Sequence, residues 1–409
     1  MQISFFDGES KFKLVKPLRL IELFAGYGSQ ALALKYLGIP FEHHAICEWA
    51  VNSIQAYKDL HHGDDNTDYS ESLTDNEIVD YLDGRISSDY STPMTREQIL
   101  RKGEKWRRNV YNNMRASNNH GSVCKVTAKD LNIMDGDKYT YMWTYSFPCQ
   151  DLSLAGKGRS MAKGSGTRSS MLWEVERLLD ECETLPDILY MENVPELINS
   201  KNIKHFAEWL AKLESLGYKN KWQVSNAKDF GIAQNRNRCY MVSIRGNYFY
   251  NPPQGFKLEY RLKHFLDKSV DEKYYLSEDT IKALNIHKER HDAAGNGFGW
   301  KPTDGSGTAT TITTEGGGYR PSSNFIVEQA RETNRQDNGH GKHIDGERLQ
   351  GVWQSINERG NGVTPPPQEI RDCDGICFHR GKEFQGGVMK GLSRTIDTQA
   401  KNGVVIWKK

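Results

Sequence analysis

The sequence of 409 residues lacks long apolar runs, an excess of charge of either sign and an even set of cysteines. None of its hydrophobic stretches approaches the roughly 20 residues of a membrane-spanning helix, so we expect a soluble protein without membrane contact. With 54 Lys and Arg against 53 Asp and Glu, the formal net charge is +1. A surface that binds a polyanion must therefore be local rather than a property of the whole molecule.

Cysteine usage and the N-terminus predict a cytoplasmic protein. The seven cysteines are scattered along the chain, which is atypical of a disulfide framework and indicates a reducing compartment. The first residues, MQISFFDGESKFKLVKP, have no apolar stretch after a basic start. They therefore do not resemble a secretion signal.

Hydrophobic periodicity predicts an α/β fold of the doubly wound, Rossmann-like type for residues 1–245. Short apolar runs at 18–24 and 41–47 have the length of strands, and a helical pattern follows each of them. The same alternation returns between Tyr139 and Ile244. Strands that alternate with helices indicate a parallel sheet covered on both faces.

Residues 62–121 interrupt this alternation with a polar stretch that is acidic in its first half and basic in its second. A sequence typical of a capping box begins at Thr95 and predicts a basic helix. The basic residues of this helix are Arg101, Lys102, Lys105, Arg107 and Arg108. We interpret the stretch as an insertion, and two alternatives stay open, a solvated surface excursion or a contact to nucleic-acid phosphates.

The composition changes after about Gly246, where the chain becomes rich in aromatic residues, Gly, Asn and Thr. This change predicts a domain boundary and a smaller, β-rich domain over residues 246–409. Two similar segments, 311–314 and 395–398, each precede a turn and an apolar strand. They indicate two strand–turn–strand units of one design.

A glycine-containing turn and an acid suggest a nucleotide-like ligand. The turn at residues 24–28 links the first strand to the first helix, where glycines let backbone N–H groups approach a ligand. A glycine pair alone is explained equally well by a plain tight turn. Glu48 follows the second strand about 20 residues on, where a doubly wound fold binds a ribose. Trp49 beside it either stacks on an adenine or packs in the core.

Three further motifs follow later strands of the predicted sheet. Phe147-Pro148-Cys149-Gln150 places a cysteine at the ligand-binding edge, where nearby cations favour its thiolate. A Gly-, Lys- and Arg-rich segment, residues 151–170, follows and is suited to closing over a phosphate-bearing substrate. Glu192-Asn193 ends the next strand. Gln234, Arg236 and Arg238 alternate before another strand, so they can share one face.

These motifs, in this order, resemble those of the DNA (cytosine-5) methyltransferases of phages and restriction-modification systems, and the resemblance covers residues 18–245. Phe24-Ala25-Gly26-Tyr27-Gly28 resembles the cofactor-binding motif of that family, and Pro148-Cys149-Gln150 its nucleophile motif. Glu192-Asn193-Val194 resembles the acid motif, and residues 234–238 resemble the Q-x-R-x-R motif. Ser29 stands where many relatives have a glycine.

The resemblance implies methyl transfer from S-adenosylmethionine to C5 of a cytosine that is flipped out of double-stranded DNA. Cys149 would add to C6 and so make C5 nucleophilic. Glu192 would donate a proton to N3, provided that burial keeps that proton on the carboxyl. Arg236 and Arg238 would contact the ring oxygen and position a loop. Gln150, Asn193 and Gln234 are the remaining substrate-side residues.

The resemblance also implies a cofactor pocket. The glycine turn would contact the adenosyl and methionine parts, Glu48 the ribose and Trp49 the adenine. The full implied set is Phe24, Ala25, Gly26, Tyr27, Gly28, Glu48, Trp49, Asp130, Leu131 and Pro148. No metal site is predicted, because Cys373, Cys377 and His379 lack a second pair of ligands.

The match weakens towards the end of the chain. Relatives carry closing motifs that complete the cofactor pocket, and only residues 347–351 and 360–363 are candidates here. We expect a monomeric enzyme. Two alternatives remain, a non-catalytic or split subunit that a second chain completes, and an enzyme of the same chemistry that acts on RNA.

Overall fold

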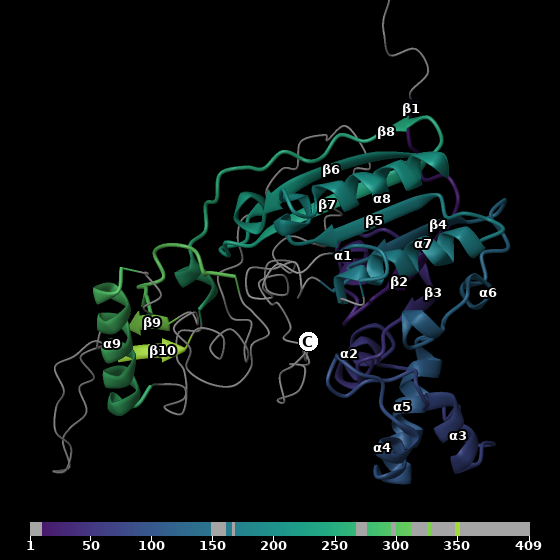
Figure 1. Cartoon of the computed structure of the whole chain (residues 1–409), viewed down its shortest axis with the longest axis horizontal. Coiled ribbons are helices and arrows are strands. Elements are labelled where there is room, and N and C mark those ends of the chain that lie inside the picture. The colour runs from purple at the N-terminus through teal and green to yellow at the C-terminus, as the bar shows by residue number, and fades with distance from the viewer. Residues whose placement is uncertain are drawn as a thin grey trace, which may run out of the picture.

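A six-stranded sheet forms the centre of the molecule (Figure 1). The computed structural model describes residues 10–148, 161–165, 168–266, 276–295, 300–311, 325–328 and 348–351. The strand order is β3-β2-β4-β5-β7-β6. The strands are β2 (Leu18–Leu23), β3 (Phe41–Cys47), β4 (Thr140–Tyr145), β5 (Ile188–Asn193), β6 (Tyr218–Asn226) and β7 (Asn237–Arg245).

The sheet is mixed rather than fully parallel. β2, β3, β4 and β5 run in parallel, whereas β7 is antiparallel to both of its neighbours. Only residues 227–236 join β6 to β7, which is shorter than the crossover that a parallel neighbour needs. β6 is an edge strand with many exposed positions, so its sequence lacks the apolar run that predicts the other strands. The expectation of an all-parallel sheet is therefore wrong for β7.

Helices cover both faces of the sheet, as expected. One face, with Trp143 and Leu189 at its centre, packs against α7 and α8. The opposite face, with Leu20 and Met142, packs against α1. The helices of this region are α1 (Ser29–Tyr36), α2 (Val51–His61), α6 (Ala128–Leu131), α7 (Leu172–Glu181) and α8 (Ile203–Ser215). Short 3-10 helices lie at Val123–Lys125, Arg168–Met171, Pro195–Ile198, Ala227–Phe230 and Leu262–Phe265.

The insertion forms a helical unit whose apolar core it shares with Ile54 of α2. Its helices are α3 (Asp75–Leu82), α4 (Arg96–Leu100) and α5 (Glu104–Ala116), which project as a group beyond α2 (Figure 1). Their buried core includes Ile78, Leu82, Ile99, Val110 and Met114. The capping box predicted at Thr95 is confirmed. The prediction of a single basic helix is wrong, because α4 ends at Leu100 and α5 starts after Gly103.

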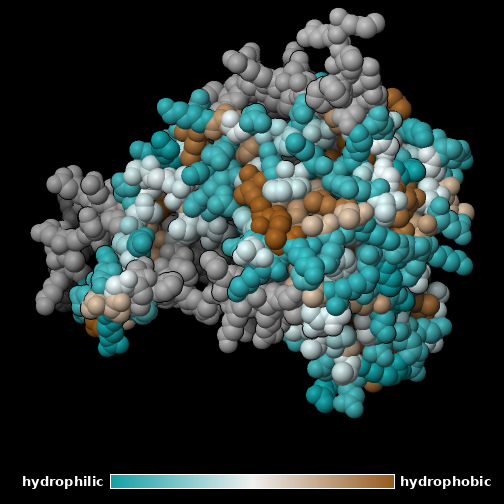
Figure 2. All heavy atoms as spheres, turned by 45° about the horizontal axis from the view of Figure 1, so that its top comes forward, coloured by the Kyte–Doolittle hydropathy of each residue, from teal (hydrophilic) through white to brown (hydrophobic). Residues whose placement is uncertain are grey.

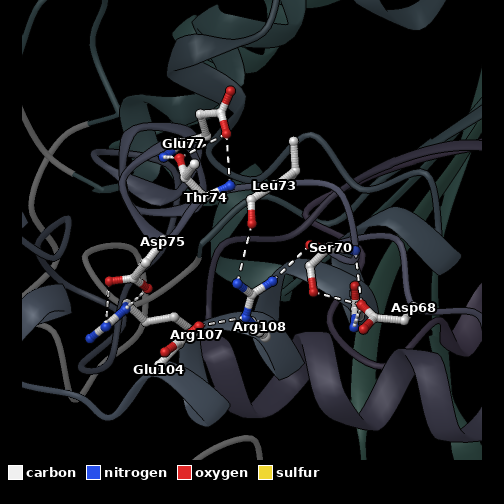
Figure 3. A network of polar contacts seen from close by, with 10 residues as sticks. Asp68, Ser70, Leu73, Thr74, Asp75, Glu77, Glu104, Arg107 and Arg108 are labelled. Carbon is white, nitrogen blue, oxygen red and sulfur yellow. Dashed lines mark hydrogen bonds and ion pairs between the residues drawn. The ribbon is translucent and has the colours of Figure 1, made fainter.

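Two of the predicted surface arginines are used inside the insertion (Figure 3). Arg107 donates to both carboxylate oxygens of Asp75, at 2.7 and 2.6 Å. Arg108 pairs with Glu104 at 2.8 Å and donates to the carbonyl of Ser70 at 2.7 Å. These contacts join α5 to the start of α3 and to the loop before it, so Arg107 and Arg108 serve the packing of the insertion.

The described residues after 246 form several smaller elements. β8 (Tyr248–Phe249) pairs in parallel with β1 (Ser10–Lys11), and β9 (Phe325–Glu328) is antiparallel to β10 (Arg348–Gly351). A helix of 16 residues, α9 (Glu278–Ala293), lies beside β9 and β10 (Figure 1). The sequence does not predict α9, because most of its surface is polar and exposed. The second Thr-containing unit lies outside the described residues.

The surface in Figure 2 is hydrophilic over most of the face shown, with apolar residues gathered in a few patches. In the described part of the chain, no helix is both long enough and apolar enough to cross a membrane.

We expect Arg107→Ala to lower the free energy of unfolding by about 2–3 kcal/mol, because the carboxylate of Asp75 then loses its charged donor. Arg107 is 7% exposed. Arg101→Ala is the matched control, since the Arg101 side chain is 77% exposed, and it should change stability by less than about 0.5 kcal/mol. Urea unfolding followed by circular dichroism measures both effects. Equal losses in the two variants would contradict the structural role of Arg107.

Candidate active site

The predicted motifs meet at one edge of the central sheet. Leu23 pairs with Cys47 on one side and with Tyr145 on the other, so the chain leaves these three parallel strands at the same edge. Asn193 at the end of β5 pairs with Cys239 near the start of β7. Ligands of open α/β sheets bind at this edge, beyond the carboxyl ends of the strands.

The loop after β2 passes through the left-handed region of backbone conformation at alternate residues. φ is 57° at Phe24, 58° at Gly26 and 79° at Gly28. A Cβ on Gly28 would lie 2.4 Å from His61 Nε2 and 2.6 Å from the Tyr57 ring, so this position requires glycine. A Cβ on Gly26 would meet no heavy atom within 4 Å. The loop therefore faces open space at Gly26, where a ligand can lie against the backbone.

Glu48 is held beside this loop by backbone donors. Its Oε2 accepts from the Gly26 N–H at 2.8 Å, and its Oε1 accepts from the Ala50 N–H at 2.6 Å. Burial raises the pKa of Glu48 to about 7, against the opposing effect of these hydrogen bonds. Each carboxylate oxygen can accept a further hydrogen bond, so Glu48 suits a ligand with hydroxyl donors. Trp49 beside it is half-buried.

Asp130 and Leu131 lie beside β3, and their contacts in the structure are structural ones. The Asp130 carboxylate accepts from the Thr127 N–H at 2.8 Å and from its hydroxyl at 2.7 Å, which caps α6. The carbonyl of the buried Leu131 contacts Nε2 of His44, on β3, at 3.1 Å. The structure thus attaches Leu131 to β3, which ends one residue before Glu48, and it engages the Asp130 carboxylate in capping.

Glu192 and the two arginines of the Q-x-R-x-R motif form one charged group. Arg238 Nε lies 2.9 Å from Glu192 Oε1, and both side chains are largely buried. Burial and the charge of Arg238 lower the pKa of Arg236, which also interacts electrostatically with Glu192 and Tyr27. Burial raises the pKa of Tyr27, and the charge of Glu192 adds to this effect. The first, third and fourth motifs are therefore brought together.

The nucleophile motif is tied to the acid motif through the backbone. Asn193 Nδ2 donates to the carbonyl of Phe147 at 3.0 Å. On the other side, Gln30 of α1 donates to the hydroxyl of Ser146 at 3.2 Å. The described chain continues to Pro148, and Cys149 and Gln150 lie outside the described residues, as does most of the basic segment that follows them. The segment that leads to Cys149 therefore lies between the glycine loop and the acid motif.

Comparison with known proteins identifies the family. The model of the C-5 cytosine-specific DNA methylases matches residues 97–368. The orphan methyltransferase M.SssI of Spiroplasma monobiae is 38% identical over 291 residues, which is 67% of this chain and 73% of that protein. The chain belongs to the C-5 cytosine-specific DNA methylase family. It is a DNA (cytosine-5) methyltransferase, and its methyl donor is S-adenosylmethionine.

One further relative and one solved structure are similar to this chain. The type II methyltransferase M2.ScrFI of Lactococcus lactis subsp. cremoris is 37% identical over 267 residues, covering 64% of this chain and 71% of that protein. The structure of the Entamoeba histolytica methyltransferase EhMeth aligns with a TM-score of 0.52 at 14% identity, covering 94% of this chain and 95% of that chain. The second match shows a shared fold.

The site residues of this methyltransferase fit its methyl donor. S-adenosylmethionine carries a ribose with two hydroxyl donors, which matches the acceptor capacity of the Glu48 carboxylate. The open space at Gly26, beside that carboxylate, gives room for a ligand at the backbone. The implied cofactor residues and the sheet edge are thus compatible.

Gln234 has a different environment from Arg236 and Arg238. It is 5% exposed and forms a bridge with Ala309, and Asn235 N–H donates to the carbonyl of Ala309 at 2.7 Å. The Thr311 hydroxyl donates to the carbonyl of Asn235 at 2.7 Å. The start of the Q-x-R-x-R motif in this methyltransferase therefore pairs with the first Thr-containing segment of the C-terminal region.

A buried acid under the glycine loop is missed by sequence reasoning. Glu22 of β2 is 0% exposed, accepts from the Tyr57 hydroxyl at 2.7 Å and accepts from the Ala31 N–H at 3.2 Å. Tyr57 contacts His43 Nδ1 at 2.8 Å. The signal available in the sequence was an acid inside an apolar strand, which marks either a network or a site. Glu22 thus anchors both α1 and α2 to the strand before the loop.

Burial raises the pKa of Glu22 from 4.5 to about 7. The folded protein therefore holds a proton on Glu22 at pH values where the unfolded chain has lost it, so this group stabilises the fold less as the pH rises from 4.5 to 7. We expect the stability of the wild type relative to Glu22→Gln to fall by up to about 3 kcal/mol between pH 5 and pH 8.

Urea unfolding of the two proteins at several pH values measures this difference. Glu214→Gln, at an exposed position of α8, is the control and should differ from the wild type by the same amount at every pH. A pH-independent difference for Glu22→Gln would contradict the proton on Glu22.

Proposed function

We propose that this methyltransferase acts on cytosine in double-stranded DNA with the target base flipped out, and that Cys149 is the nucleophile and Glu192 the acid. The observation that carries the proposal is the Glu192–Arg238 pair, 2.9 Å apart at the carboxyl edge of the sheet. The bond from Asn193 to the Phe147 carbonyl supports it, because it brings the segment before Cys149 to the same place.

Cys149 acts by covalent catalysis. Its thiolate forms a bond to C6 of cytosine, and the electron pair of the C5–C6 double bond moves towards C5 and N3. C5 would then gain the methyl group as the carbon–sulfur bond of the donor breaks, which would leave S-adenosylhomocysteine. Loss of the C5 hydrogen as a proton to water would restore the C5–C6 double bond as the S–C6 bond breaks and the thiolate leaves, and the N3 proton would return to Glu192. C5 of free cytosine is too electron-poor for direct methylation, so the thiolate addition is the step that makes the reaction possible.

Glu192 acts on the ring nitrogen that gains electron density. Arg238 occupies Oε1, and we assign Oε2 to N3 of the base. We propose that Glu192 donates a proton to N3 when the flipped base lies against Oε2 and water is excluded from the site. Arg238 then orients the carboxyl and, with Arg236, contacts the ring oxygen.

The residues that would hold the cofactor are those of the glycine loop and Glu48. S-adenosylmethionine would supply a methyl group on a sulfonium sulfur, which is strongly electrophilic. The loop residues Phe24 to Gly28 would bind it through backbone groups, Glu48 would accept from the ribose hydroxyls and Trp49 would stack on the adenine. Asp130, Leu131 and Pro148 would complete the pocket.

The region 246–409 is proposed as the target-recognition domain. Its support is the pairing of Ala309 and Thr311 with Asn235, which attaches this region next to the catalytic arginines. We propose that one chain suffices, because the family match extends to residue 368 and so includes both candidate closing fragments. The free cysteines Cys47, Cys124, Cys182 and Cys239 support a cytoplasmic location.

Duplex DNA that contains 5-fluorocytosine at the target tests Cys149. Fluorine replaces the C5 hydrogen and cannot leave as a cation, so elimination is blocked and the S–C6 bond persists once the methyl group has been added. We expect a covalent protein–DNA complex with the wild type in the presence of S-adenosylmethionine and none with Cys149→Ser. Cys124→Ser, at an exposed cysteine, is the control and should trap DNA as the wild type does. Trapping by Cys149→Ser would remove Cys149 from the mechanism.

Glu192→Gln tests the acid. An amide does not supply the proton, so we expect kcat to fall by about 10²- to 10⁴-fold while the Kd for duplex DNA changes little. Single-turnover methylation and a DNA-binding titration separate the two quantities. Glu214→Gln on α8 serves again as the exposed control. Near-normal turnover in Glu192→Gln would refute the role at N3.

A further inference from the structure

We propose that Asn119, at the end of the 62–121 insertion, is a positioning residue for the cofactor-binding carboxylate of Glu48. The insertion is then a structural part of the cofactor site rather than a surface excursion or a phosphate contact. This inference rests on the proposed role of Glu48 in binding S-adenosylmethionine.

The side chain of Asn119 forms hydrogen bonds with the backbone of Glu48 on both sides of its Cα. Asn119 Oδ1 accepts from the Glu48 N–H at 3.0 Å, and Asn119 Nδ2 donates to the Glu48 carbonyl at 2.9 Å. Oδ1 also accepts from the Gly121 N–H at 2.9 Å. Asn119 is 2% exposed. A side chain that both donates and accepts from fixed positions is needed here, which a carboxylate or an aliphatic group does not provide.

The backbone around Asn119 extends the sheet beyond β3. Ile46 N–H donates to the carbonyl of Asn118 at 3.1 Å, and His120 N–H donates to the carbonyl of Ile46 at 2.9 Å. Ile46 and Asn119 therefore form a parallel bridge. The residues that lead into Glu48 are thus fixed by the insertion before the chain leaves the strand.

A second segment of the insertion holds the chain after Glu48. Ser87 N–H donates to the carbonyl of Trp49 at 2.7 Å, and Val51 N–H donates to the carbonyl of Ser87 at 3.0 Å. The two insertion segments are joined at the base of the insertion, because the N–H of Ser122, the residue that follows it, donates to the carbonyl of Arg85 at 2.9 Å. Residues 46–51 therefore lie in a cradle. Two segments of the insertion, around Ser87 and Asn119, form one part of it, and the glycine loop forms the other, since Ala25 N–H donates to the carbonyl of Cys47 at 3.1 Å.

The cradle sets the direction of the Glu48 carboxylate. The hydrogen bonds from Gly26 and Ala50 to that carboxylate need the Glu48 backbone in one orientation, which Asn119 fixes. Without Asn119, the N–H and carbonyl of the buried Glu48 lose their partners, and the carboxylate is no longer presented to the glycine loop. We expect the loss to weaken S-adenosylmethionine binding by about tenfold.

Isothermal titration of S-adenosylmethionine into the full-length chain tests the proposal. Asn119→Ala removes both contacts, and Asn119→Asp keeps the volume but removes the donor to the Glu48 carbonyl. Both variants should raise the Kd about tenfold or more, and at saturating cofactor their kcat should stay within about twofold of the wild type. If Asn119 positions Glu48, its variants should therefore differ from the wild type in the KM for the cofactor rather than in kcat.

Two controls separate positioning from general stability. Asn109→Ala removes another asparagine of the insertion, one that bonds Gln55 rather than Glu48, and should bind the cofactor as the wild type does. Ile99→Val loosens the insertion core and should lower the midpoint of thermal unfolding with little change in Kd. If Asn119→Asp is folded and binds with the wild-type Kd, or if Ile99→Val raises the Kd equally, the proposal is wrong.

Binding by a Glu48 variant distinguishes a failure of the proposed function from a failure of this inference. If Glu48→Gln binds S-adenosylmethionine as tightly as the wild type, the role of Glu48 itself is wrong. If Glu48→Gln weakens binding and Asn119→Asp does not, only the positioning role of Asn119 is refuted.

Discussion

The common direction of β2, β3, β4 and β5 is the constraint on which the site depends. Parallel strands deliver the residues that follow them to one edge, so motifs far apart in sequence become neighbours. The reversal of β7 adds to this arrangement, because an antiparallel strand begins at the edge where its neighbour β5 ends. Arg238 near the start of β7 therefore faces Glu192 at the end of β5.

Two buried carboxyls fix the glycine loop and the elements next to it. Glu22 holds α1 and α2 to the strand before the loop, and Glu48 accepts from the loop itself at Gly26. Burial raises the pKa of both to about 7. Burying them costs free energy, and the loop also contains a strained Phe24. The hydrogen bonds to these acids offset part of that cost and keep the loop in one conformation.

The sequence predicts the core strands of the sheet and the site motifs, but not the exposed elements or the contacts that hold the site residues in place. Apolar runs and the glycine turn predict β2, β3, β4 and β5 because burial on both faces leaves a strong pattern. β6 and α9 are missed because exposed elements carry little apolar signal. The order of the strands in the sheet depends on the side to which each connection takes the chain, and the sequence pattern does not reveal this.

The contacts that orient the site are the least visible in the sequence. Asn119 lies 71 residues from Glu48, and no local pattern marks an asparagine whose partner is a distant backbone. The roles of Arg107 and Arg108 are equally hard to predict, since the sequence does not distinguish an arginine that pairs inside the fold from one that binds phosphate. Only the fold shows which of them are used internally.

The closure of the insertion at its base has a consequence for how such enzymes can diverge. The bond from Ser122 to Arg85 joins the two ends of the segment that carries α4 and α5. We expect additions or deletions in its loops, away from Ser87 and Asn119, to leave the hydrogen bonds to residues 46–51 in place. A change in length there should therefore cost less than a substitution at Asn119, which removes two hydrogen bonds to Glu48.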